Sequence, residues 1–152
     1  MSTIADTLDA FLAEQHHRLA ERTYHRYADI IDLFRTCMEG YGPNSLDDTE
    51  LAQWRAASDD DPDAFAHLFG PEKIPGELGE FFAWFLPRKV AGGIEMTKTA
   101  RTVVKKLAVW LEANGHIPHT AVLDMTEQAN DAVEAEAADD NDYLDDFLYD
   151  LD

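Results

Sequence analysis

Residues 81–111 read FFAWFLPRKVAGGIEMTKTARTVVKKLAVWL. This stretch contains the densest aromatic run of the chain. It also has the strongest cluster of positive charge, because residues 88–106 hold six bases and one acid, 6 − 1 = +5. The pair Gly92-Gly93 separates two apolar segments, which predicts two helices joined by a break. We therefore expect the fold to be built around these two helices.

The segment after the glycine pair predicts an amphipathic helix that begins at residues 95–97 and ends at Asn114-Gly115. At about 100° per residue its apolar side chains share one face, which we expect to lie in the core. This face consists of Ala100, Val103, Val104, Leu107, Trp110 and Leu111. Lys98, Arg101 and Lys105 share the opposite face, which favours contact with water or with an anion.

The segment before the glycine pair predicts a helix that begins at Pro75 and carries a broad aromatic face for the core. Pro87 lacks a backbone donor and disfavours helical geometry at the residue before it. We therefore expect this helix to end near Phe85 or to kink there.

Patterns of helical period also occur upstream of the central pair. They cover about residues 3–17, 20–39, 48–57 and 61–69. Together with the central helices they predict an all-α chain, with a compact bundle of five to six helices over residues 1–118.

Arg18, Arg22 and Arg26 follow one another at a spacing of four residues and share a face if the turn before Arg22 is helical. Two interpretations are open. The arginines form a solvated face that pairs with nearby carboxylates, or they form a stripe that contacts phosphates. The carboxylates in reach are Glu14, Glu21 and Asp29.

The formal net charge of −19 is unevenly distributed. Residues 124–152 hold 12 acids and no Lys or Arg, so residues 1–123 hold 31 − 12 = 19 acids against 12 bases, a net of −7. We therefore expect residues 119–152 to be an acidic tail, partly helical, with little to bury over residues 126–138. The tail is either an interaction segment or a solubilising one. Asp outnumbers Glu by 19 to 12, so a halophilic source is a further explanation of the acidity.

The last residues, 141–152, read NDYLDDFLYDLD. Here acids alternate with apolar side chains, and on a helix Leu144, Phe147 and Leu148 share one face with Leu151. Acidic amphipathic peptides of this kind fold on a basic or apolar groove of a partner. The predicted protein-binding residues are Tyr143, Leu144, Asp145, Asp146, Phe147, Leu148 and Leu151.

The cysteine content and the hydropathy of the chain indicate its compartment. Cys37 is the single cysteine, which excludes an internal disulfide and favours a reducing compartment. No apolar stretch approaches the roughly 20 residues that span a bilayer, and no signal-peptide pattern is present. We therefore predict a cytoplasmic protein with no membrane partner.

The run of aspartates at 59–63 is not a calcium loop, because the sixth position is Ala64 and the twelfth is Gly70. His116 and His119 flank Pro118, which breaks the helix geometry that a metal pair needs. No glycine-rich phosphate loop or marked catalytic set occurs. We predict no catalytic residue, no metal, no cofactor and no enzyme activity.

Three stretches of the chain resemble one known family. They are residues 19–27, which read LAERTYHRY and are followed by Phe34, residues 46–51, which read LDDTEL, and residues 98–117, which run from Lys98 through Trp110-Leu111 to Gly115-His116-Ile117. In these stretches the segment from Ile4 to about Pro118 resembles the N-terminal core-binding (SAM-like) domain of phage integrases and tyrosine recombinases.

This resemblance implies a helical bundle that grips one side of duplex DNA with its basic faces. The matching residues here are Arg22, Arg26, Lys98, Arg101 and Lys105. The catalytic domain of the family would follow Pro118, where only 152 − 118 = 34 residues remain and none is Lys or Arg. We therefore expect no catalysis of the recombinase kind.

Two functions from different classes follow. The first is a regulatory module that binds a basic protein partner through its acidic C-terminal segment. The second is a DNA-binding module with a basic face that the tail masks, either within one chain or in a homodimer. The predicted DNA- or anion-binding residues are Arg22, Arg26, Arg88, Lys89, Lys98, Arg101, Lys105 and Lys106.

Overall fold

The computed structural model describes the backbone of residues 2–90 and 92–150, and side chains as far as Ala138. Over these residues the chain is helical and contains no strand, as predicted. The helices are α1 (Ile4–Arg18), α2 (Glu21–Tyr41), α3 (Asp48–Ser58), α4 (Ala64–Leu68), α5 (Ile74–Glu80), α6 (Leu86–Lys89), α7 (Gly93–Ala113) and α8 (His119–Asp150). Short 3-10 turns occupy Gly42–Ser45 and Pro71–Lys73, and a π-helical turn, η3 (Phe81–Phe85), joins α5 to α6.

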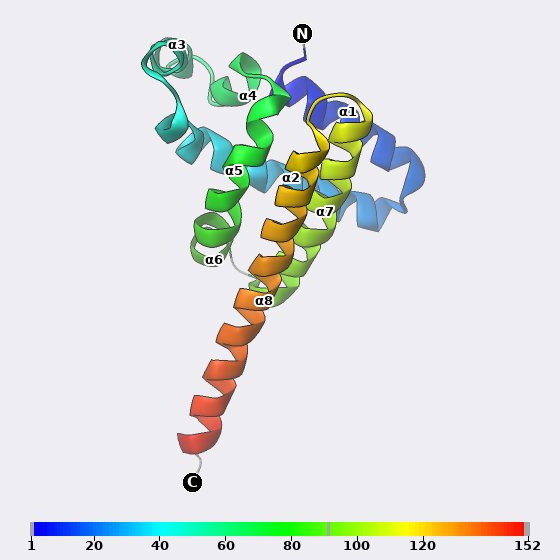
Figure 1. Ribbon diagram of the computed structural model, residues 1–152, viewed down its shortest axis with the longest axis vertical. Helices are drawn as coiled ribbons and strands as arrows, with labels where there is room; N and C mark the ends of the chain where they lie inside the picture. The colour runs from blue at the N-terminus through cyan, green and yellow to red at the C-terminus, as the bar shows by residue number, and fades with distance from the viewer. Residues whose placement is uncertain (1, 91, 151–152) are drawn as a thin grey trace.

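When α5, η3 and α6 are counted as one continuous helix, the described chain has seven helices, against the five to six predicted for residues 1–118. Six of the seven lie within residues 1–118, and the seventh is α8. The most extensively packed pair of helices is α7 and α8, which run side by side in opposite directions (Figure 1), and not the two helices that flank the glycine pair. The predicted apolar face of α7 is confirmed, since Ala100, Val103 and Leu107 are fully buried. Lys98 and Lys105 on the other side of α7 are exposed, again as predicted.

Aromatic contacts connect α7 and η3 to the N-terminal helices. The rings of Phe11 on α1 and Trp110 on α7 meet edge to face at 5.7 Å, and those of Phe34 on α2 and Phe81 on η3 at 5.2 Å. Edge-to-face pairs add stability beyond that of the apolar area they bury. The core therefore lies where α1, α2 and η3 meet α7.

The helix that precedes the glycine pair does not end at Phe85, so that part of the prediction is wrong. The predicted distortion takes the form of a π turn, in which the Leu86 N–H donates to the Phe81 carbonyl. A π turn widens the helix before Pro87, whose ring would otherwise press on the carbonyl of the previous turn. That carbonyl, of Ala83, accepts a hydrogen bond from Nη1 of Arg88 at 3.1 Å.

The first half of α8 belongs to the core. Val122, Met125, Ala129 and Val133 are buried at helical spacing, and the expectation that residues 126–138 have little to bury is therefore wrong. The sequence obscured this stripe because small alanines and exposed glutamates surround it. A domain boundary at residue 118 stays a prediction.

Beyond this packed half, α8 continues as a helix to Asp150 and extends past the rest of the molecule (Figure 1). Of the helices described, none is both long enough and apolar enough to cross a membrane.

Candidate functional site

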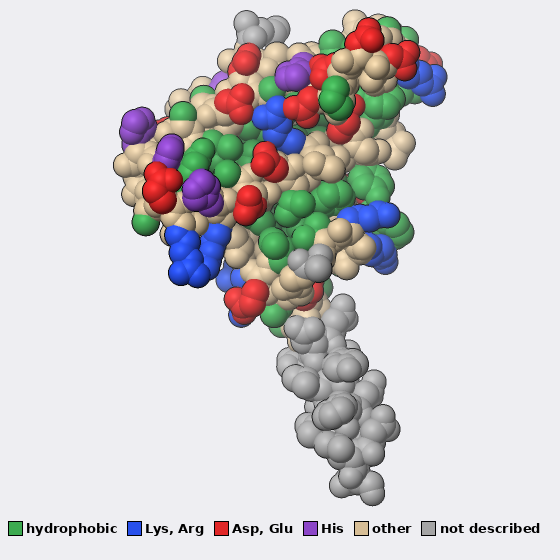
Figure 2. Space-filling view, turned by 180° about the vertical axis from the view of Figure 1, so that it is seen from behind, with side chains coloured by type: hydrophobic (Ala, Val, Ile, Leu, Met, Phe, Trp, Pro, Cys, Tyr) green, Lys and Arg blue, Asp and Glu red, His purple; other side chains and the backbone are tan. Residues whose placement is uncertain are grey.

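The eight predicted anion-binding residues lie on three elements. Arg22 and Arg26 lie at the start of α2, Arg88 and Lys89 on α6, and the other four along α7. Figure 2 shows Lys and Arg side chains at opposite edges of the body, one group beside histidines and another where α6 lies. The structure therefore separates part of what the sequence analysis grouped as one basic region.

Arg88 is held by its own helix. Besides its hydrogen bond to the Ala83 carbonyl, its guanidinium stacks over the Trp84 ring at 4.0 Å from the centroid. The indole N–H of Trp84 donates to the Tyr41 hydroxyl at 2.8 Å. The local role of Arg88 is to satisfy the carbonyl that Pro87 leaves without a donor.

The three-arginine stripe is not formed. The first helix ends at Arg18 and the second begins at Glu21, so Arg18 does not share a helix with Arg22 and Arg26. Arg18 pairs with Glu14 at 2.8 Å, as the solvated-face interpretation predicts. Arg22 and Arg26 remain on one exposed face, and within the described part of the chain neither has an ionic partner.

A groove between the end of α1 and the second half of α7 gathers three cations around apolar side chains. We call it the basic groove, and its volume is about 640 Å³. Its lining consists of Glu14, Gln15, Arg18, Leu19, Lys105, Lys106, Val109, Trp110, Ala113 and Asn114. Val109 is 61% exposed and presents an apolar side chain to solvent in this lining.

The one carboxylate of the basic groove is already engaged. Glu14 accepts hydrogen bonds from Arg18 and from the indole N–H of Trp110. Lys105 contacts only the Asn130 amide oxygen, with Nζ at 3.4 Å, and Lys106 has no ionic partner among the described side chains. Three cations against one acid, 3 − 1 = +2, make this lining locally positive in an acidic protein.

The sequence analysis found Lys105 and Lys106 but not the rest of this groove. Arg18 and Leu19 come from α1, about ninety positions away in the chain, and helical period carries no information on such long-range contacts. Val109 was the available signal, because it is apolar and lies outside the predicted core face of its helix.

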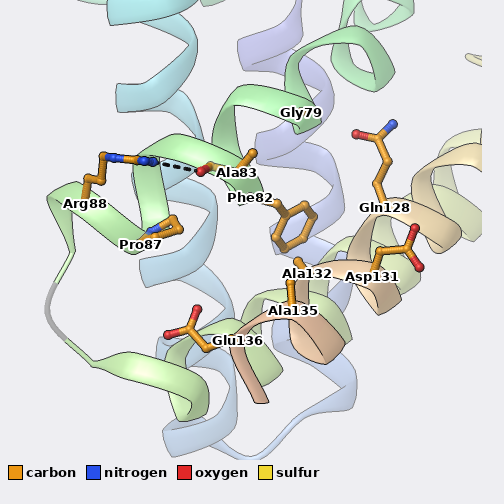
Figure 3. A pocket seen from close by; sticks show the side chains of 10 residues that line it. All are labelled: Gly79, Phe82, Ala83, Pro87, Arg88, Gln128, Asp131, Ala132, Ala135 and Glu136. Atoms are coloured by element: carbon orange, nitrogen blue, oxygen red, sulfur yellow. Dashed lines mark hydrogen bonds between the residues drawn. The ribbon is translucent and has the colours of Figure 1, made fainter. Parts of the chain in front are cut away.

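A second groove lies between α8 and the helix formed by α5, η3 and α6 (Figure 3). Phe82 points toward Ala132 and Ala135 across it, and Asp131 and Glu136 lie on its α8 side. Glu136 also accepts a hydrogen bond from the Thr97 hydroxyl at 3.2 Å. The groove of about 690 Å³ is mainly apolar, and its polar lining residues are Arg88, Gln128, Asp131 and Glu136.

The thiol of Cys37 is buried in the core and does not line any of the grooves. Burial, together with the nearby charges of Glu77 and Glu80, raises the pKa of the Cys37 thiol to about 12. A thiol in this environment stays protonated and unreactive.

Among the described residues no group of three or more His, Cys, Asp or Glu is arranged to hold a metal ion.

The predicted protein-binding residues of the tail lie outside the described side chains. They are Tyr143, Leu144, Asp145, Asp146, Phe147, Leu148 and Leu151. The backbone of α8 covers all but the last of them.

Comparison with known proteins finds no matching family model, curated protein or solved structure. The likeness to the core-binding domain of tyrosine recombinases therefore stays a prediction.

Proposed function

We propose that the protein is a non-catalytic binding module that acts through protein interaction, with residues 139–152 as its binding element. The observation that carries this proposal is the register of α8 on α7. The Thr97 hydroxyl meets Glu136 at 3.2 Å, and α7 begins only four residues earlier, at Gly93. Four residues of helix span about 6 Å, so α8 leaves the end of α7 close to residue 140.

The composition of this segment sets the kind of partner. Residues 139–152 contain seven aspartates and no Lys or Arg, interspersed with Tyr143, Leu144, Phe147, Leu148 and Leu151. An acidic helix with one apolar face binds a groove that is apolar at its floor and basic at its rim. We therefore infer a protein partner with a basic groove of this type.

A test uses a synthetic amphipathic helix of Lys and Leu as the probe, titrated into the full chain by calorimetry. Asp145, Asp146 and Asp150 are changed to Asn in one variant, and a matched control changes Asp29, Asp59 and Asp60, which are exposed acids elsewhere. We expect the tail variant to bind about tenfold more weakly, a loss of about 1.4 kcal/mol. Equal affinities of the tail variant and the control would contradict the proposal.

Binding of duplex DNA is the second candidate function, because Arg22 and Arg26 lie exposed on one face with no ionic partner among the described residues. Phosphate contacts make affinity fall steeply with salt. Anisotropy of a labelled duplex across a salt series should show this slope, and Arg22→Gln with Arg26→Gln should reduce it. If the chain fails to bind at low salt, the DNA candidate is rejected.

A further inference from the structure

The molecule carries two complementary surfaces far apart from each other. One is the basic groove between α1 and α7, and the other is the acidic segment 139–152. We propose that the basic groove of one copy binds segment 139–152 of a second copy, so that copies associate head to tail. This inference rests on the proposed function, because it takes the same segment as the binding element and names its partner.

The groove has the chemistry that the segment requires. Arg18, Lys105 and Lys106 surround the exposed side chain of Val109 and the half-buried ring of Trp110. The segment brings seven aspartates and six aromatic or aliphatic residues. Glu14, the only acid in the groove, is occupied by Arg18 and Trp110, so it leaves the two lysines available to an incoming carboxylate.

The lengths also agree. Along α7 the groove runs from Lys105 to Asn114, which is about 14 Å of helix. The apolar positions of the segment, from Leu144 to Leu151, span about 11 Å when helical. Two turns of a helix can therefore lie along the groove with their apolar face on Val109.

The segment of the same copy cannot reach this groove while α8 is intact. Glu136 lies level with Thr97, and Val109 is twelve residues further along α7 in the direction opposite to the course of α8. Asp150 is fourteen residues beyond Glu136 in the other direction. At 1.5 Å per residue, the groove and the end of α8 are about 40 Å apart.

A second copy removes this obstacle. Because groove and segment are different surfaces, the contact is heterologous. The copy at one end of the assembly keeps an unused groove, and the copy at the other end keeps an unused segment. Copies of net charge −19 repel one another at long range. At about 0.1 M salt the screening length is about 10 Å, which weakens this repulsion but keeps close ion pairs. At about 1 M salt we expect the association to weaken.

Sedimentation velocity of the full-length protein at about 0.1 M salt tests the proposal. The groove variant carries Lys106→Gln and Val109→Glu, both at exposed positions, and the segment variant carries Leu144→Ser, Phe147→Ser and Leu148→Ser. The control is Arg55→Glu, which changes the net charge by the same amount as the groove variant on the exposed surface of α3.

We expect the wild type and the control to form larger species as concentration rises, and each of the two variants alone to remain monomeric. An equimolar mixture of the two variants should form a dimer and nothing larger, because one supplies the only intact segment and the other the only intact groove. A monomeric mixture, or a groove variant that still self-associates, would overturn the proposal. If the Lys/Leu peptide nevertheless binds the tail, the proposed function stands and only the self-association fails.

Discussion

Glu39 shows how single polar residues hold this small bundle together. One carboxylate oxygen accepts a hydrogen bond from the Trp54 indole at 3.0 Å, and the other accepts one from the Phe65 backbone N–H at 2.8 Å. These contacts link α2 to α3 and α4. They matter most for α3, which has no buried residue of its own. Hydrogen bonds to a charged group contribute about 1.5–3 kcal/mol.

Glu77 makes stability depend on pH. It is 5% exposed, and burial raises its pKa above the 4.5 of a solvated glutamate, while the Ser45 hydroxyl and the charge of Lys73 oppose the shift. A raised pKa means that the folded state holds the proton more tightly. The stability that this group contributes is therefore fully present below the unfolded pKa and is lost as pH rises through the folded pKa.

Glu77→Gln keeps a neutral side chain at every pH, so we expect its stability relative to the wild type to be greater near pH 7 than near pH 4. Urea unfolding of both proteins at the two pH values measures this difference. A difference that does not change with pH would show that Glu77 titrates alike in the folded and unfolded states.

Contacts at this scale could not be predicted from the sequence. Nothing in the sequence around Glu39 or Glu77 distinguishes them from the other acids of the chain. Their hydrogen-bond partners are far away in the sequence, and only the folded chain brings them close. Thr3 is different, because its capping partner Asp6 is three residues away and the pair is visible in the sequence.

At the scale of helices, the regular spacing of apolar residues decided which elements could be predicted from the sequence. The helix α7 has large aliphatic residues on one face and cations on the other, and its end and its buried side follow directly. Its start at Gly93 lies before the predicted residues 95–97. In α8 the buried stripe contains an alanine and lies among glutamates, so its core role was missed. At Pro87 the sequence predicted an end or a kink but not its form, because a π turn depends on tertiary packing.

The packing of α8 leads to a prediction at this scale. Met125 is fully buried and Leu123, two residues earlier, is 58% exposed. We expect Met125→Ala to lower the free energy of unfolding by about 2–5 kcal/mol, and Leu123→Ala to change it by less than about 0.5 kcal/mol. Urea unfolding compares them, and similar effects of the two substitutions would argue against the packing described for α8.

For the whole molecule, the main feature is the division of α8 into two parts with different roles. Residues 119–138 complete the core, and residues 139–152 hold the acidic segment that we propose as the binding element. The basic groove depends on the meeting of α1 and α7, which only the complete fold provides. The local sequence therefore predicts the acidic segment but not the basic groove.

Urea unfolding of three chains tests this division of α8 most directly: the full chain, a chain ending at Ala138 and a chain ending at Pro118. We expect the chain ending at Ala138 to match the full chain within about 0.5 kcal/mol. The chain ending at Pro118 loses four buried apolar side chains, three of which are large ones that contribute about 1.5–3 kcal/mol each, and should fail to fold cooperatively. Cooperative unfolding of the Pro118 chain at the stability of the full chain, or a large loss in the Ala138 chain, would contradict the division.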